Sequence, residues 1–203
     1  MIIPFIKTCL ACNLGILASY PLETMKAREI TNNTDIDTYA GIKAPLVMGG
    51  ISNGIRFQIF KCIKQYNTCI ALLAAGVFSG CMFIPFELYK LSQQMKHKQS
   101  IVTLQGGHII MMKEVLLTSI QFYLYHRLES GDPILNIIYG GTSSAIAISV
   151  VHPFDVIYVN FMLNNYAPLY TIKNVYLWKG FKYNVLKTFV GYGLTMSIIS
   201  MIK

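Results

Sequence analysis

The chain has 203 residues, of which 54% are hydrophobic and only 13% charged, and its formal net charge is +8. About a quarter of the residues in a soluble domain are charged, so this composition argues against an ordinary water-exposed surface and favours a membrane protein. The positive charges are dispersed along the chain, which argues against nucleic-acid binding as their purpose.

The first expected helix covers residues 5–30. Its apolar start and Lys7 also fit a secretory signal. We favour a retained helix, because Pro21-Leu22-Glu23 ends this apolar stretch and the same pattern of proline, any residue and carboxylate returns twice later in the chain.

Five further helices are expected in chain order, at about 43–65, 69–93, 107–129, 134–160 and 181–202. Residues 65–86 and 133–154 contain no Asp, Glu, Lys or Arg, and about 20 such residues cross a bilayer as a helix. The links inside each helix pair carry much of the positive charge, which marks the inner side of a membrane. Both termini are therefore expected on the other side, and a soluble all-helical core is the alternative.

The three motif prolines, Pro21, Pro85 and Pro153, lie 64 and 68 residues apart. Such regular spacing indicates one structural unit used three times. The sequence therefore predicts an all-α membrane protein, a single domain of six transmembrane helices in three pseudo-symmetric two-helix repeats around a central cavity. The expected repeats are 1–66, 67–131 and 132–203.

Charged residues interrupt the second helix of each pair, as at Lys113-Glu114 and Lys187. A charge within a membrane is costly unless it faces water or an opposite charge, so these helices are expected to line an aqueous cavity. Snorkelling from a helix end is the alternative, but Lys113 lies too deep for it. Gly76-x-x-x-Gly80 and Gly140-x-x-x-Ser144 have the spacing of close helix contacts.

Lys26 and Lys90 follow their motif carboxylates by three residues. This Pro-x-acidic-x-x-basic pattern, repeated at the ends of the odd helices, resembles the mitochondrial carrier family over the whole chain. A second signature of that family, an aromatic residue two before a glycine, is present as Trp178-Lys179-Gly180 and more weakly as Tyr39-Ala40-Gly41, and the third copy, 104–106, has lost the aromatic residue. The repeats are about two-thirds as long as the family's.

The resemblance implies a monomeric solute transporter of the mitochondrial inner membrane, with both termini on the intermembrane-space side and cardiolipin bound near Trp178, Lys179 and Gly180. The three motif prolines would kink their helices. A matrix-side gate would pair Glu23 with Lys90 and Asp155 with Lys26, while Tyr158 faces Glu87 and Gln94 braces the first pair. The implied substrate contacts are Met48, Ser52, Arg56, Lys113, Glu114, Gln121 and Lys187. The implied outer gate is Lys61, Lys64, His126, Glu129, Ser200 and Lys203, in which most of the family's acidic positions are lost.

Arg56, Lys113 and Lys187 outnumber Glu114 at the implied substrate contacts, which predicts a positive cavity that attracts an anion or a carboxylate-bearing zwitterion. Transport of an amino or carboxylic acid by alternating access is therefore the expected function. The alternative is a carrier-fold membrane protein without regulated transport, which leaks ions, remodels membranes or binds a partner. No enzyme, cofactor or metal is expected, because the sequence has no clustered nucleophile and base and its histidines and cysteines are scattered.

Overall fold

The computed structural model describes residues 2–32, 37–39, 41–43, 45–94, 107–164 and 176–201, and describes only the backbone at 2–4, 48, 88, 90–94 and 162–164. This part of the chain is all-α. Its elements are α1 (Ile2–Thr31), a π-helical turn η1 (Pro45–Gly49), α2 (Gly50–Lys64), α3 (Thr68–Gln94), α4 (Gly107–Leu128), α5 (Pro133–Asn164) and α7 (Phe181–Met201).

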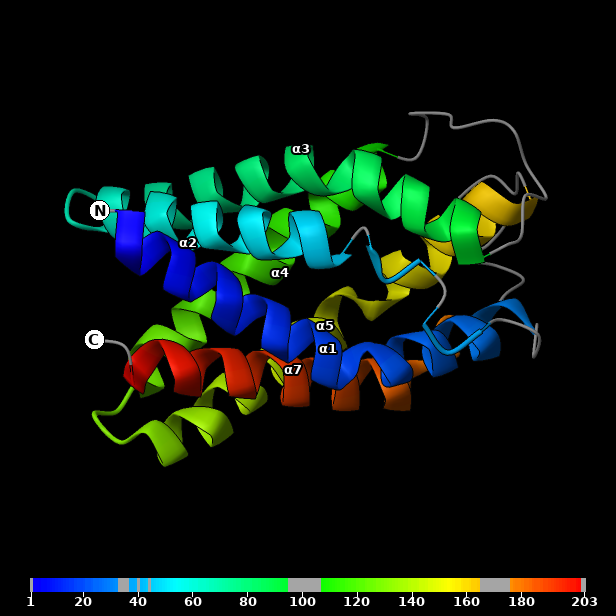
Figure 1. Ribbon diagram of the computed structural model, residues 1–203. Helices are drawn as coiled ribbons and strands as arrows, with labels where there is room; N and C mark the ends of the chain where they lie inside the picture. The colour runs from blue at the N-terminus through cyan, green and yellow to red at the C-terminus, as the bar shows by residue number, and fades with distance from the viewer. Residues whose placement is uncertain are drawn as a thin grey trace.

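The six α-helices form a closed ring. Each helix packs on its neighbours in the chain, and α7 returns to pack on α1. Both termini lie at one end of the bundle together with the short links after α2 and α4, as Figure 1 shows. The ring therefore has an inside and an outside, and its six helices run along the bundle in alternating directions.

The expected helix positions agree closely with these elements, with one difference. The helix expected at 43–65 is divided into η1 and α2, so that α2 begins at Gly50. Pro45 opens the π-helical turn, where its missing N–H leaves no unmade hydrogen bond. The odd helices α1, α3 and α5 instead continue through their motif prolines and end well beyond them.

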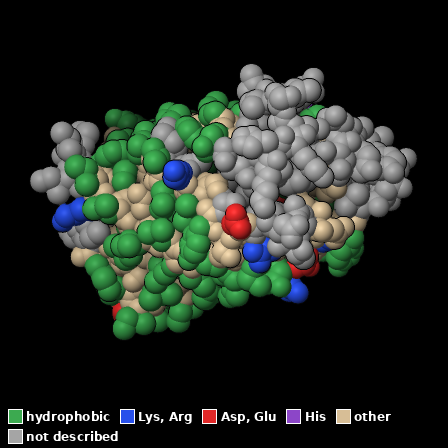
Figure 2. Space-filling model, turned by 45° about the vertical axis from the view of Figure 1, so that its right-hand side comes forward, with side chains coloured by type: hydrophobic (Ala, Val, Ile, Leu, Met, Phe, Trp, Pro, Cys, Tyr) green, Lys and Arg blue, Asp and Glu red, His purple; other side chains and the backbone are tan. Residues whose placement is uncertain are grey.

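The outer face of the ring is apolar. Exposed apolar side chains recur every three or four residues along α1 (Ile6, Leu10, Leu14, Leu17) and along α3 (Ile70, Leu73, Val77). On the face seen in Figure 2, hydrophobic side chains are spread over the described surface and few charged side chains lie among them. Contiguous exposed apolar surface of this kind marks a lipid or protein contact rather than a face in water.

The inside of the ring contains many polar and charged residues beside its apolar ones, whereas such residues are mostly exposed in a soluble protein. Among the buried polar and charged residues are Glu23, Lys26, Ser52, Arg56, Glu114, Gln121, Asn136, His152, Asp155 and Asn184. By length and composition, three helices suffice to cross a membrane, at Phe5–Thr31, Thr68–Glu87 and Pro133–Phe161. Three helices of membrane-spanning length, an apolar exterior and buried charges are features of an integral membrane protein.

Small residues allow the closest helix approaches. A Cβ at Gly76 would lie 2.8 Å from the Cα of Val115, so α3 and α4 touch backbone to backbone there. A Cβ at Gly140 would lie 2.9 Å from Met196 of α7. Gly140 and Ser144, expected to contact one neighbouring helix, contact two different ones. Gly140 packs on α7, whereas Ser144 accepts a hydrogen bond from Gln121 of α4.

Two of the expected repeats share a local arrangement. In the first, the ring of Tyr20, just before the motif proline, stacks on Tyr39, and their centroids are 6.2 Å apart. In the third, His152 occupies the same place before its proline and stacks on Trp178, also at 6.2 Å. Gly41 and Gly180, each two residues after its aromatic partner, have φ values of 77° and 76°. The left-handed backbone at both positions is one that glycine adopts without a steric cost.

Candidate functional site

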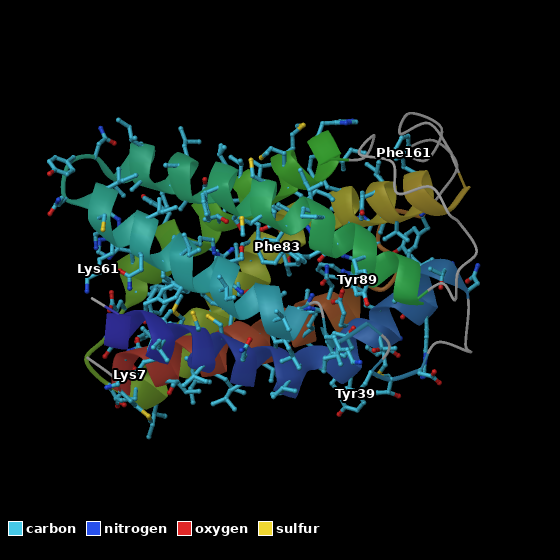
Figure 3. All side chains as sticks on the ribbon, turned by 45° about the horizontal axis from the view of Figure 1, so that its top comes forward. Lys7, Tyr39, Lys61, Phe83, Tyr89 and Phe161 are labelled. Atoms are coloured by element: carbon cyan, nitrogen blue, oxygen red, sulfur yellow. The ribbon has the colours of Figure 1, made fainter. Side chains whose placement is uncertain are left out.

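A central cavity of about 220 Å³ lies inside the ring. Eight charged side chains of the described residues line it, of which four are carboxylates (Glu23, Glu87, Glu114, Asp155) and four are cations (Lys26, Arg56, Lys113, Lys187). Phe83, which Figure 3 shows toward the middle of the bundle, is part of the lining. The positive excess expected from the substrate contacts is therefore absent from the described lining, because the motif carboxylates line the same cavity and balance the charge.

Seven of these charges (Lys187, Glu23, Lys26, Asp155, Lys113, Glu114 and Arg56) form a continuous chain of ion pairs. Lys187 donates a short hydrogen bond to Glu23, and Lys26 lies 4.0 Å from the same carboxylate. Lys26 also contacts Asp155 at 3.1 Å, which is one of the two gate ion pairs that the motif resemblance implies.

The chain of ion pairs continues across the ring through Lys113. Its ammonium lies 3.2 Å from Asp155 and 3.3 Å from Glu114. Arg56 approaches Glu114 at 3.9 Å and donates a hydrogen bond to Thr118, while Ser79 donates to Glu114. Two cations expected to contact substrate, Lys113 and Lys187, are thus paired with carboxylates expected to form the gate.

Asn184 holds part of this network in place. Its side-chain NH₂ donates to Asp155 at 2.9 Å, and its carbonyl oxygen accepts from Lys26 at 3.4 Å. The same NH₂ lies 2.9 Å from Nδ1 of His152, whose Nε2 is 3.1 Å from the carbonyl oxygen of Lys179. Donation by the amide to Nδ1 leaves the proton of a neutral imidazole on Nε2, where it bonds that carbonyl. This fully buried amide therefore links α7 to both members of the Lys26–Asp155 pair.

An aromatic layer stands at the end of the central cavity nearer the termini. Phe57 lines this cavity and also a second cavity of about 420 Å³. The ring of Phe57 lies 4.9 Å from that of Phe122 and 6.4 Å from that of Tyr192. The ring of Phe60 also lies 4.9 Å from that of Phe122. The two cavities therefore share Phe57, whose ring belongs to this aromatic layer.

The second cavity holds four of the expected outer-gate residues: Lys61, Lys64, His126 and Glu129. Lys64 lies 3.1 Å from Nδ1 of His126, which is 4.0 Å from Glu129. Lys61 lies at the end of the bundle that carries Lys7, away from Tyr89 and Tyr39 (Figure 3). Ser200 instead donates a hydrogen bond to the carbonyl oxygen of Ser197, and Lys203 lies outside the described residues.

A third hollow, of about 470 Å³, lies on the surface beside the Trp178-Lys179-Gly180 signature. Arg28, Asn32 and Lys179 are among its lining residues, and Lys179 donates a hydrogen bond to Asn32 at 2.6 Å. The lining thus contains two cations, Arg28 and Lys179, and one carboxylate, Glu29.

The remaining expected residues fall in different places. Ser52 is fully buried but lies outside the lining of the central cavity, where α2 instead presents Asn53, Arg56 and Phe57, because a one-residue step turns the helix face by about 100°. Tyr158 packs in an apolar cluster with Ile109, Ile110 and Ile157. Its hydrogen bond to Glu87 stays a prediction. The side chains of Met48, Lys90 and Gln94 lie outside the described residues, as does the Glu23–Lys90 pair.

Sequence reasoning missed several polar residues of the cavity. Asn184 lies three residues before Lys187 on the same helix and lines the same cavity. A polar residue one helical turn from an expected contact was the available signal. Within the described residues, no three His, Cys, Asp or Glu side chains come together as a metal site requires.

Comparisons of the chain with protein-family models, with curated proteins and with solved structures each found no match.

Proposed function

We propose that this chain is an integral membrane solute transporter of carrier-like architecture. In this proposal all six helices cross the membrane, as three related pairs, and a small charged metabolite passes through the central cavity. The substrate class is an amino or carboxylic acid.

The observation that carries the proposal is a cavity lined by eight charged side chains inside a ring whose outer face is apolar. Buried charges in a membrane protein are costly and typically mark a path for ions or solutes. A structural core would be filled with apolar side chains at lower cost, since replacing buried ion pairs by apolar residues is often neutral or stabilising.

The network also suits a protein that changes state. Ion pairs in a polar cavity contribute modest net free energy, because desolvation offsets much of their attraction. They can break and re-form when a solute interacts differently with two conformations. The aromatic layer formed by Phe57, Phe60, Phe122 and Tyr192 supplies a barrier on the side of the termini.

The carrier-like architecture is supported by the three motifs and by the arrangement that two repeats share. Tyr20 with Tyr39 and His152 with Trp178 make equivalent ring contacts at equal distances, each next to a motif proline. We also propose the mitochondrial inner membrane as the location, with the termini on the intermembrane-space side and cardiolipin at the Arg28–Lys179 surface. That part rests on the motif resemblance.

Ligand stabilisation of the purified protein tests the proposal. A solute that binds the folded state at free concentration c stabilises it by RT ln(1 + c/Kd) and so raises the unfolding temperature as its concentration exceeds Kd. We expect at least one amino or carboxylic acid, from a panel that also contains nucleotides and polyamines, to raise the midpoint in detergent. No shift with any compound, together with ungated ion leak from liposomes, would refute transport and support a carrier-fold protein without it.

A further inference from the structure

The cations expected to bind substrate are already occupied in this structure. Lys187 donates a short hydrogen bond to Glu23, and Lys113 bridges Asp155 and Glu114. A solute carboxylate that binds either lysine therefore competes with a carboxylate of the protein for the same ammonium. Binding and gate opening would then be a single exchange of ion-pair partners.

The charge balance sets a condition on that exchange. The described lining holds four carboxylates and four cations. A monoanion that pairs with Lys187 leaves Glu23 with one fewer partner inside the ring. A monocation that pairs with Glu23 leaves Lys187 with one fewer partner. Loss of one partner from a buried pair is strongly unfavourable. A zwitterion supplies an ammonium for the carboxylate and a carboxylate for the ammonium, and so leaves the balance unchanged.

Exposure identifies the pair at which the exchange begins. The side chain of Lys187 is 28% exposed, whereas those of Lys26, Lys113 and Arg56 are 10%, 12% and 7% exposed. Lys187 is therefore the cation of the network that a solute entering the cavity meets most readily. Its partner Glu23 also contacts Lys26 at 4.0 Å, so displacement of Glu23 is transmitted to the Lys26–Asp155 pair.

We propose that the substrate is a small zwitterion with one ammonium and one carboxylate, and that it binds by separating the Glu23–Lys187 pair. Its ammonium then pairs with Glu23 in place of Lys187, and its carboxylate pairs with Lys187 in place of Glu23. This inference rests on the proposed transport function and narrows its substrate class. The Glu23–Lys187 pair is both the first substrate contact and the first link of the gate.

Uptake into liposomes tests the substrate class with matched compounds. The proteinogenic amino acids other than Asp, Glu, Lys and Arg form the zwitterion panel, because those four carry a net charge. L-lactate and L-alaninamide are the monoanion and the monocation matched to L-alanine, and phenyllactate and phenylalaninamide are those matched to L-phenylalanine. We expect saturable uptake of at least one amino acid and at least tenfold slower uptake of all four charged analogues. Uptake of an analogue but of no amino acid would overturn the inference while leaving transport intact. No uptake of any compound would overturn transport itself.

Variants of the pair test the exchange. Glu23→Gln removes the competing carboxylate, so we expect it to permit monoanion uptake and to lower zwitterion uptake at least tenfold. Lys187→Gln is expected to have the opposite charge preference and to admit the monocation. If both variants fold but keep the zwitterion preference of the parent, the exchange is wrong even though transport stands.

The control for these variants is Lys182→Gln on the same helix. Lys182 pairs with Glu29 at 3.9 Å on the surface, where its side chain is 70% exposed. This variant should keep both the rate and the preference of the parent. If neither pair variant folds, thermal unfolding of the unchanged protein tests the substrate class instead. L-alanine and L-phenylalanine should then raise Tm at least as much as their charged analogues do, and a larger rise with an analogue would overturn the inference.

Discussion

Asp155→Asn removes one negative charge from the middle of the network with almost no change in shape. Asp155 contacts Lys26 at 3.1 Å and Lys113 at 3.2 Å, and accepts a hydrogen bond from Asn184 at 2.9 Å. The substitution therefore leaves two buried ammonium groups facing a neutral amide. Lys26 keeps Glu23 at 4.0 Å and Lys113 keeps Glu114 at 3.3 Å, so neither lysine loses every carboxylate.

The magnitude follows from these remaining contacts. Breaking a buried ion pair by removing one partner costs about 3–5 kcal/mol. Because each lysine retains one carboxylate, we expect the lower end, about 3 kcal/mol, which corresponds to a fall of about 6–12 °C in Tm for a chain of this length. Removing the surplus cation as well, in Asp155→Asn with Lys113→Met, should recover about 1–3 kcal/mol relative to the sum of the single changes.

The assay is thermal unfolding of the purified protein in one detergent for the parent, both single variants and the double variant. The surface pair Lys182–Glu29, removed by Lys182→Gln, is the control and should change stability by about 0–1 kcal/mol. If the two central substitutions add without coupling, or if Asp155→Asn is as mild as the surface control, the charges do not act as one network.

Three further outcomes are expected. Gly76→Val should loosen the α3–α4 contact and lower Tm, because its Cβ would lie 2.8 Å from the Cα of Val115. Gly180→Ala should cost about 1–2 kcal/mol in thermal unfolding, because an L-residue is strained at a φ of 76°. Phe122→Leu should open the aromatic layer and speed the reaction of Cys12, which lines the central cavity, with a water-soluble thiol reagent added on the side of the termini.

Each of these has its own control or refuting result. Gly131→Ala should leave Tm unchanged, because nothing lies within 4 Å of its added Cβ. Substitution of Gly180 without loss of stability would show that the left-handed backbone there is not required. The labelling experiment uses a variant with the other four cysteines changed to serine, and an unchanged labelling rate in Phe122→Leu would mean that the aromatic layer is not the barrier.

The sequence was sufficient to locate the helices. Apolar stretches that end near Pro21, Pro85 and Pro153 predicted α1, α3 and α5, because a long apolar segment in a bilayer has few alternatives to a helix. The division of the helix expected at 43–65 was not predicted. It depends on Pro45 and on the close packing of Gly50 against Asn13, which local sequence does not encode.

The sequence predicted which residues line the site better than it predicted which of them form ion pairs with each other. Most of the expected gate and contact residues that the structure describes line the central cavity or the second cavity. Their separation into a gate and a substrate site did not match the geometry, because Glu23 and Lys187 are 164 residues apart and meet only through the α1–α7 closure of the ring. Asn184 was missed because an amide within a helix carries no charge signal until its partners are known.

Counterflow tests the central claim most directly. Purified protein in liposomes preloaded with an unlabelled amino acid should accumulate the labelled form transiently above its external concentration, because each inward passage is coupled to an outward one through the same cavity. The overshoot should be absent in Asp155→Asn liposomes that contain equal amounts of folded protein. A parent protein that only equilibrates the label, at a rate proportional to concentration without saturation, would contradict a solute carrier.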